Sequence, residues 1–368
     1  MSRLRDRLEG FPRFFNRPSR RQMAQERGLE RIDRLSFNES PLGPSPAVRD
    51  AVREESERLG DYPTFADDDL RAAIAAQIGR GLGPEHLLTG AGAYEVLELL
   101  TRSFVEPGEE VVLSLPTFEA SPRIVGLEGG EVVDVPLLRP SFRLDVEGLL
   151  AAVTERTRMV WVCNPNNPSG VGVTAAEMAT HFERLPERVI LLADEAYHQF
   201  VRSPDAPDTL AQVAAGRPNL LVVHSLSKAY GLAGLRLGYA LGPPELLDLA
   251  ARRHRAFHLS RLHLAAGIAA VGDARYVERV AEFVLGERDR LQQGLRSLGL
   301  EPLPSETNFL CVELPVAAQD ATSRLTDHGV LIRPLDDLGL ERHVRINVGS
   351  REANDRLLAG LKDFLTGR

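Results

Sequence analysis

Residues 189–197 read Val189-Ile190-Leu191-Leu192-Ala193-Asp194-Glu195-Ala196-Tyr197, an unbroken apolar run that ends in two acidic residues. An apolar run without alternation is typical of a strand that is covered on both faces. Amphipathic helical stretches, for example Tyr94–Phe104 and Ala175–Leu185, fall between this run and others like it. The other runs are Glu110–Leu115, Arg158–Cys163 and Leu220–His224. This alternation predicts an α/β fold with a mostly parallel sheet and helices on both of its faces.

The apolar pattern changes after residue 245, where the sequence predicts a smaller α+β domain. A long helical region is followed by strand candidates at Phe309–Glu313, Val330–Arg333 and His343–Val348, and then by a terminal helix. Near the start of the chain, closely spaced prolines predict an extended arm that crosses the cleft between the domains. We therefore expect an N-terminal arm at residues 1–45, a large domain at residues 46–245 and a small C-terminal domain at residues 246–368.

The composition of the chain excludes several classes of protein. The chain has 368 residues and a formal net charge of −8, whereas a nucleic-acid surface needs an excess of basic charge. No apolar run approaches the ~18 residues that a membrane span needs, and no secretory signal is expected at the N-terminus. Cys163 and Cys311 both lie in apolar runs, which predicts reduced core residues, no metal site and a cytoplasmic protein.

Four short segments carry the unusual residues of the chain. Three of them directly follow an apolar run, so they should meet at the edge of the sheet where ligands bind in parallel sheets. A turn, a helix cap or a solvated lysine could explain any one of them alone, but their combination in this order indicates a site. The segments are Asn164–Gly170, Asp194–Tyr197, Ser225–Lys228 with Gly231, Gly234 and Arg236 behind it, and Arg345–Gly349.

These residue types match what pyridoxal 5'-phosphate (PLP) requires from a protein. Lys228 is the candidate for the Schiff base with the cofactor, because only a lysine side chain supplies the amine. Asp194 would face the pyridine nitrogen and keep it protonated, since a carboxylate at the end of an apolar strand needs a charged partner. Asn167 and Tyr197 would donate hydrogen bonds to the ring oxygen, and Tyr197 is counted with Lys228 and Asp194 as catalytic.

The phosphate of the cofactor needs amides at a helix N-terminus, hydroxyl groups and an arginine. Gly92, Ala93 and Tyr94 open the helix that begins near Glu95, and their backbone would supply the amides. The other predicted phosphate ligands are Ser225, Ser227 and Arg236.

Together these segments resemble those of the fold-type I PLP enzymes, the aspartate aminotransferase superfamily. The branch to which the chain is most similar is that of histidinol-phosphate aminotransferase, which has segments like Asn38–Pro44 and Asp61-Tyr62-Pro63 of this chain. The resemblance covers the chain from about Leu35 to the C-terminus. It implies an aspartate aminotransferase-like large domain, a PLP-dependent aminotransferase, and Phe118 stacked on the cofactor ring. It also implies a homodimer in which Tyr62 reaches the phosphate of the neighbouring subunit's cofactor.

The residues that would select the substrate follow the resemblance less closely. Arg345 matches the arginine that holds the anionic group of the substrate in this family, usually by a two-pronged contact. Arg333 matches a second arginine of the histidinol-phosphate branch, and two arginines suit a phosphate. Arg333 could equally form an ion pair with Asp336 or Asp337, so both alternatives stay open.

Several departures from the branch leave the reaction open as well. Gly92-Ala93-Tyr94 replaces a more acidic helix start, and Phe257–His263 replaces a segment rich in proline and asparagine. The first hypothesis is transamination of histidinol phosphate or a similar small amino substrate, with Asn167 contacting the substrate as well as the ring. The second is oxidation or cyclisation of an arginine-like amino acid, with Glu39 near the substrate, or decarboxylation of a phospho-amino acid. The third is a PLP-fold regulator without catalysis, against which the presence of Lys228 counts.

Overall fold

The computed structural model describes residue 11, residues 19–64 and residues 67–366 of the chain. Its large domain is built on a seven-stranded sheet with the strand order β2-β8-β7-β6-β5-β3-β4. The strands from β7 to β4 in this order are parallel, and β8 is antiparallel to both of its neighbours. The predicted α/β class is therefore confirmed. The strands are β2 (Leu87–Gly90), β3 (Glu110–Leu113), β4 (Glu131–Asp134), β5 (Thr157–Cys163), β6 (Ile190–Asp194), β7 (Leu220–Ser225) and β8 (Gly238–Leu241).

Helices cover both faces of this sheet, because each central strand is apolar on both sides. On one face, side chains such as Leu100 of α5 and Ile124 of α6 pack against the sheet. On the other face, Met178 of α8 and Ala266 of α11 belong to a second apolar core. The helices of the large domain are α3 (Pro46–Ser56), α4 (Asp68–Ile78), η1 (Pro84–His86), α5 (Ala93–Phe104), α6 (Ala120–Glu128), α7 (Val146–Ala151), α8 (Ala175–Arg184), η2 (His198–Phe200), α9 (Thr209–Ala214), α10 (Pro244–Ala251) and α11 (Arg261–Val271).

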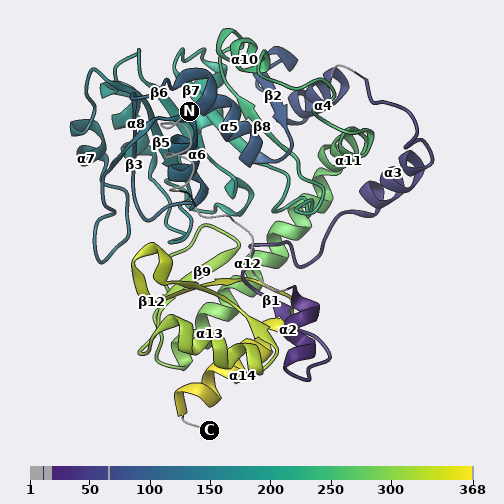
Figure 1. The fold of residues 1–368 in the computed structure, drawn as a ribbon, viewed down its shortest axis with the longest axis vertical. Coiled ribbons are helices and arrows are strands. Elements are labelled where there is room, and N and C mark those ends of the chain that lie inside the picture. Colours follow the sequence, from purple (N-terminus) through teal and green to yellow (C-terminus); the bar gives the residue numbers. More distant parts are fainter. Residues whose placement is uncertain (1–10, 12–18, 65–66, 367–368) are drawn as a thin grey trace.

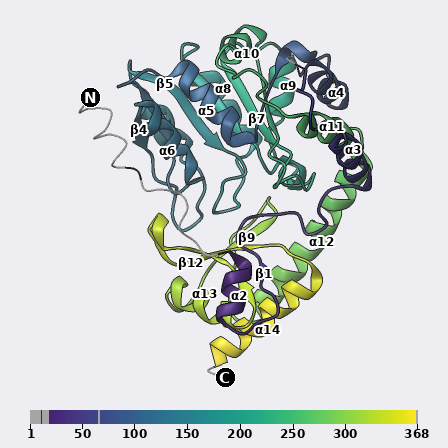
Figure 2. The ribbon, with the colours of Figure 1, turned by 45° about the vertical axis from the view of Figure 1, so that its right-hand side comes forward.

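The small domain lies below the large domain in Figures 1 and 2, and α12 (Ala274–Ser297) passes from one to the other. Its antiparallel sheet has the order β11-β12-β9, and α12, α13 and α14 pack against it through residues such as Leu291, Leu325 and Leu357. The remaining elements of this domain are β9 (Phe309–Glu313), α13 (Ala318–Asp327), β10 (Val330–Leu331), β11 (Arg333–Leu335), η3 (Asp336–Leu338), β12 (Leu340–Asn347) and α14 (Arg351–Thr366).

Residues 20–35 pack with the small domain. Strand β1 (Asp33–Arg34) pairs in parallel with β10, and α2 (Arg20–Glu26) precedes it. Leu35 is buried in the core of the small domain, whereas α11 packs with α3 and α4 on the large domain. On this packing we propose that the chain crosses between the domains at residues 36–45, and that the second domain boundary lies within α12, beyond residue 246.

Three further features concern membrane helices, metal sites and the cysteines. No described helix is both long enough and apolar enough to cross a membrane. Within the described ranges, no group of His, Cys, Asp and Glu side chains could hold a metal ion. Cys163 and Cys311 are both free and buried, as their apolar surroundings predict.

Candidate active site

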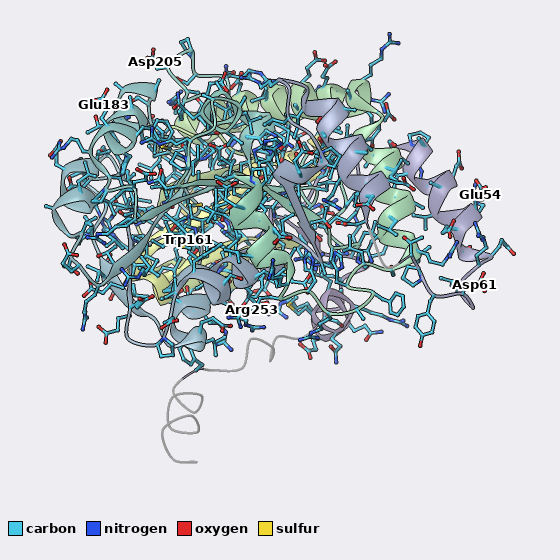
Figure 3. The ribbon with its side chains drawn as sticks, turned by 90° about the horizontal axis from the view of Figure 1, so that it is seen from above. Glu54, Asp61, Trp161, Glu183, Asp205 and Arg253 are labelled. Carbon is cyan, nitrogen blue, oxygen red and sulfur yellow. The ribbon has the colours of Figure 1, made fainter. Side chains whose placement is uncertain are left out.

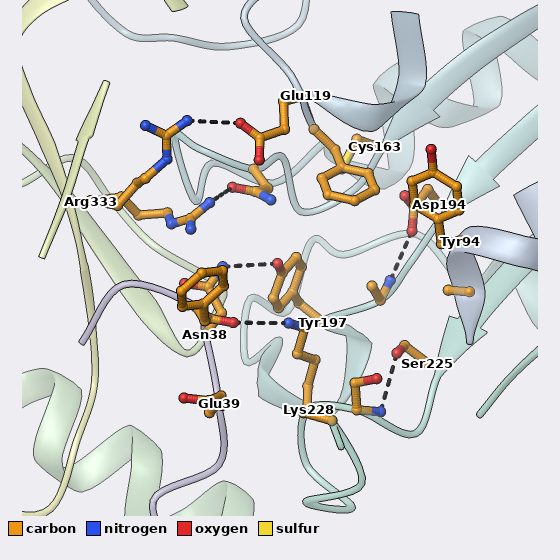
Figure 4. Close-up of a pocket in the computed structure, with 18 of the residues that line it drawn as sticks. Asn38, Glu39, Tyr94, Glu119, Cys163, Asp194, Tyr197, Ser225, Lys228 and Arg333 are labelled. Atoms are coloured by element: carbon orange, nitrogen blue, oxygen red, sulfur yellow. Dashed lines mark hydrogen bonds and ion pairs between the residues drawn. The ribbon is translucent and has the colours of Figure 1, made fainter. Parts of the chain in front are cut away.

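A cavity of about 440 Å³ lies between the two domains, at the edge of the sheet where β5, β6 and β7 end. The strand register places Cys163 beside Asp194 and Asp194 beside Val223, so the segments after these strands open into the same space. All predicted site residues except Tyr62 line this cavity, and several of them are drawn in Figure 4. They are Glu39, Ala93, Tyr94, Phe118, Asn167, Asp194, Tyr197, Ser225, Ser227, Lys228, Arg236, Arg333 and Arg345.

Asp194 is the last residue of β6 and is only 3% exposed. Its Oδ1 accepts a hydrogen bond from the amide of Ala196 at 3.3 Å. Burial raises the pKa of Asp194 to about 7, and the neighbouring Glu195 contributes to the rise, while the amide of Ala196 and the charge of Lys228 oppose it. A cation opposite Asp194 would stabilise the charged carboxylate and lower this pKa. The surroundings of Asp194 therefore favour a positively charged ring nitrogen.

Lys228 follows β7 on a turn that the backbone closes through the Gly231 amide and the Lys228 carbonyl, 3.1 Å apart. Its Nζ donates to the carbonyl oxygen of Phe37 at 3.5 Å and lies 5.6 Å from the centre of the Tyr197 ring. Burial lowers the pKa of Lys228 to about 7, and the charge of Arg345 acts in the same direction. Near neutral pH the amine is therefore available both as a nucleophile and as a proton acceptor.

Tyr197 and Asn167 line the same cavity as Lys228. The hydroxyl of Tyr197 accepts a hydrogen bond from Nδ2 of Asn38 at 3.0 Å (Figure 4). Burial raises the pKa of the Tyr197 hydroxyl, which therefore stays protonated and can donate a hydrogen bond in turn. The Oδ1 of Asn167 accepts from the guanidinium of Arg345, which fixes the orientation of the amide.

Backbone amides, hydroxyls and a guanidinium converge at the N-terminus of α5. Gly92 precedes this helix with a φ of +90°, and a Cβ at this position would lie 2.5 Å from NH2 of Arg236. Arg236 NH1 also donates to Oγ of Ser227 at 3.3 Å, and the amide of Ser227 donates to Oγ of Ser225 at 3.2 Å. A glycine is thus required for the close approach of the backbone to Arg236, and the resulting donor set suits a phosphate.

Arg345 lies on β12 and projects into the cavity from the small domain. Its NH2 donates to the carbonyl of Ser36 at 2.8 Å and its NH1 to Asn167, so both of these acceptors are neutral oxygens. Its Nε is buried and has no hydrogen-bond partner among the described residues. Leaving such a donor unpaired costs ~1–3 kcal/mol. Because its guanidinium has no carboxylate partner among the described residues, an anionic ligand in the cavity would balance its charge.

Arg333 lies beside Arg345 in the register of β11 and β12, but its charge is already balanced. Its NH2 donates to Oε2 of Glu119 at 2.7 Å and to Oδ2 of Asp337 at 2.8 Å. The ion pair that the sequence left open is therefore formed with Asp337. The other candidate, Asp336, accepts from Nε2 of Gln319 at 3.0 Å instead.

Glu39 and Tyr62 are the two remaining predicted residues, one inside the cavity and one outside it. Glu39 lines the cavity and forms an ion pair with Arg34, whose Nε is 2.8 Å from Oε2 of Glu39. Tyr62 is 78% exposed and stacks on Phe257, with ring centroids 4.8 Å apart. Figure 3 shows the neighbouring Asp61 at the outer edge of the molecule. Tyr62 therefore does not contribute to the cavity of its own chain.

Arg34, Asn38 and Glu119 are among the lining residues that sequence reasoning missed. Asn38 belongs to a segment that had been singled out only for its resemblance, and Glu119 directly follows Phe118, so both had a nearby signal. Arg34 had none, because its place depends on how β1 packs against the small domain.

The described residues fit PLP on three observations. A lysine amine with a lowered pKa and a buried carboxylate line the same cavity. Gly92, with a φ of +90°, lets the guanidinium of Arg236 lie against the backbone at the start of α5, where a Cβ would meet it. Arg345 lines the same cavity and has no carboxylate partner among the described residues, which suits an arginine that holds an anionic substrate group. This donor set suits the ring, the phosphate and the substrate of a PLP enzyme.

Comparison with known proteins agrees with this geometry. Residues 32–361 match the family model described as aminotransferase class I and II. A histidinol-phosphate aminotransferase of Moorella thermoacetica is 35% identical over 94% of this chain and 88% of its own length. An aromatic amino acid aminotransferase of Thermobifida fusca is 37% identical over 98% of this chain and 97% of its own.

A solved structure shares both the fold and the cofactor. The histidinol-phosphate aminotransferase of Sinorhizobium meliloti, in complex with pyridoxal-5'-phosphate, superposes with a TM-score of 0.89 at 32% identity. The match covers 100% of this chain and 98% of that one. The chain therefore belongs to the aminotransferase class I and II family and is a PLP-dependent aminotransferase of fold type I.

Proposed function

We propose that this enzyme transfers the amino group of histidinol phosphate to a 2-oxo acid. The observation that carries the proposal is the pair of arginines at the wall of the cavity, Arg345 and Arg333, which lie side by side on β12 and β11. A carboxylate needs one guanidinium, whereas a phosphate with two negative charges is best matched by two. The names of the relatives from Moorella and Sinorhizobium support the same substrate.

We assign the roles at the cofactor as follows. Lys228 holds PLP and then carries the proton between the substrate and its product. Asp194 holds a proton on the pyridine nitrogen, and Phe118 covers the ring. When bound, PLP supplies a ring that accepts the electron pair of the substrate's Cα–H bond. Asn167 and Tyr197 donate to the ring oxygen, and the phosphate ligands are the amides of Ala93 and Tyr94 together with Ser225, Ser227 and Arg236.

We also propose that the enzyme works as a homodimer in the cytoplasm, without a nucleic-acid or membrane partner. Tyr62, Leu59 and Leu42 are large side chains that are exposed in the single chain, at 78%, 63% and 37%. Tyr62 is nevertheless held in place, since it stacks on Phe257 and its carbonyl accepts from Arg261 at 3.2 Å. A second copy that covered this surface would receive Tyr62 at its own cofactor phosphate.

Aromatic amino acids are the second candidate substrates. The relative from Thermobifida that carries this activity in its name is 37% identical. Phe37, Tyr94 and Phe118 line the cavity, and the charge of Arg333 is balanced by two carboxylates. The relatives named above are all aminotransferases, so transamination takes precedence over the oxidation, cyclisation or decarboxylation of other substrates.

A single-turnover assay tests this proposal. Purified enzyme loaded with PLP is mixed with one amino donor at a time, and the bound cofactor is then released and analysed by chromatography. With histidinol phosphate we expect conversion of PLP to pyridoxamine phosphate at low donor concentration. With histidinol, which lacks the phosphate, conversion should need a much higher concentration. Equal conversion with both donors, or conversion only with an arginine-like amino acid, would contradict the proposed substrate.

A further inference from the structure

Arg333 forms ion pairs with both domains, and a ligand can replace one of its two carboxylate partners. It projects from the small domain and is 7% exposed, and its NH2 is bound by Glu119 of the large domain and by Asp337 of the small domain. Because each carboxylate contacts only this one nitrogen, neither of them makes the two-pronged contact that gives arginine–carboxylate pairs their strength. A ligand that offers two oxygens to the guanidinium can therefore replace one of them.

Glu119 is the carboxylate that such a ligand would replace. Of the two carboxylates, only Glu119 lines the cavity, directly after Phe118. Its side chain is 46% exposed, so a displaced Glu119 can turn into water at little cost in desolvation. Asp337 lies four residues from Arg333 in the same domain and stays with it when the domains move relative to each other.

Glu119 also balances the charge of Arg333 when the substrate does not reach this arginine with an anionic group. Arg345 and Arg333 are neighbours on adjacent strands. Burial lowers the pKa of Arg345, and the charge of Arg333 acts in the same direction, whereas Glu119 opposes it. Without a second anion in the cavity, Glu119 thus completes the charge balance of the two guanidinium groups.

We propose that Glu119 determines specificity, by competing for Arg333 with the phosphate of the substrate. A substrate whose anionic group is a phosphate that reaches both arginines must displace Glu119, whereas an aromatic amino acid, whose single carboxylate needs only Arg345, leaves the pair with Arg333 intact. This inference rests on the proposed function, since it names Glu119 as the residue of the same site that separates histidinol phosphate from aromatic amino acids.

Substitution of Glu119 by Gln tests this competition. Glu119→Gln should raise kcat/KM for histidinol phosphate about fivefold, the scale of a partly exposed ion pair. It should leave kcat/KM for phenylalanine within about twofold. Glu128→Gln is the matched control, because Glu128 ends the helix α6 that Glu119 precedes but pairs with Arg102 outside the cavity; it should change neither value. An equal change for both substrates would mean that Glu119 acts only on domain closure, and would overturn the proposal.

A binding measurement keeps this test separate from that of the proposed function. Inorganic phosphate is titrated into the PLP-loaded enzyme by calorimetry, which needs no turnover. Glu119→Gln should bind phosphate about fivefold more tightly than the unmodified enzyme. The gain should vanish in the background of Arg333→Ala, since the competition requires Arg333. An unchanged affinity, or a gain that persists without Arg333, would contradict competition even if histidinol phosphate is turned over.

Discussion

The two ends of the active site are built in different ways. At the cofactor end, Asp194 and the segment before Lys228 close neighbouring strands of one sheet, so the backbone register brings them together. At the substrate end, Arg333 and Arg345 come from the small domain, Glu119 from the large domain and Glu39 from the segment between them. The cofactor end depends on one sheet, whereas the substrate end depends on how separate parts of the chain approach each other. We therefore expect substitutions at the cofactor end to abolish chemistry and those at the substrate end to change selectivity.

The largest effect is expected for Lys228→Ala. Without this amine the enzyme has neither an attachment point for PLP nor a proton carrier, and the proton carrier alone contributes about 10²–10⁴-fold in rate. We expect turnover to fall by at least about a thousandfold with an unchanged circular dichroism spectrum. The chain has one other lysine, Lys362, which is exposed on α14. Lys362→Ala is therefore the matched control and should remain fully active.

A somewhat smaller loss is expected for Asp194→Asn. The neutral amide cannot hold a proton on the pyridine nitrogen, and loss of such a charge commonly costs about 10²–10³ in rate. PLP should remain bound, which its absorbance after gel filtration would show. If the rate stayed near normal, Asp194 would serve only as the acceptor for the amide of Ala196.

At the substrate end, Arg345→Lys should act on binding. Lysine keeps the positive charge but cannot reproduce the planar fork of donors. We expect the half-saturation concentration to rise about tenfold for every substrate, the scale of a lost charge-assisted hydrogen bond, with a smaller change in kcat. Steady-state kinetics with histidinol phosphate and phenylalanine would measure this. A rise for only one of the two would show that Arg345 does not hold both the phosphate of the one and the carboxylate of the other.

The pH dependence of PLP binding probes Lys228 itself. Because its pKa is lowered to about 7, the amine is protonated below this pH and neutral above it. The rate at which PLP attaches to the cofactor-free enzyme should therefore rise about tenfold between pH 6 and pH 8 and then level off. Stopped-flow absorbance would follow the attachment. A rate that continues to rise steeply through pH 9 would indicate a lysine with an ordinary pKa.

The smallest effect is expected for Tyr62→Phe. Loss of a hydrogen bond from the partner subunit to the charged phosphate should weaken PLP retention by ~1–3 kcal/mol. Equilibrium dialysis would measure the retention, and sedimentation would give the oligomeric state. A fully active monomer would refute the cross-subunit role of Tyr62.

Much of the cofactor end could be predicted from the sequence, since the residues after parallel strands meet at one edge whatever the rest of the chain does. The segments around Asn167, Asp194 and Lys228 illustrate this. The partners of Arg333 could not be chosen in the same way, because Glu119 reaches it only through the approach of the two domains. Asn38 was overlooked as a contact of Tyr197 for a related reason, as its position depends on the crossing segment.

The chemistry of this enzyme depends above all on Lys228. Reduction of the PLP-loaded enzyme with sodium borohydride, followed by proteolysis and mass spectrometry, tests it most directly. With only Lys228 and Lys362 in the chain, the result has few possible outcomes. We expect one modified peptide, carrying the reduced cofactor on Lys228 in a one-to-one ratio with the chain. A cofactor on Lys362, or a Lys228 peptide that stays unmodified in active enzyme, would contradict the account.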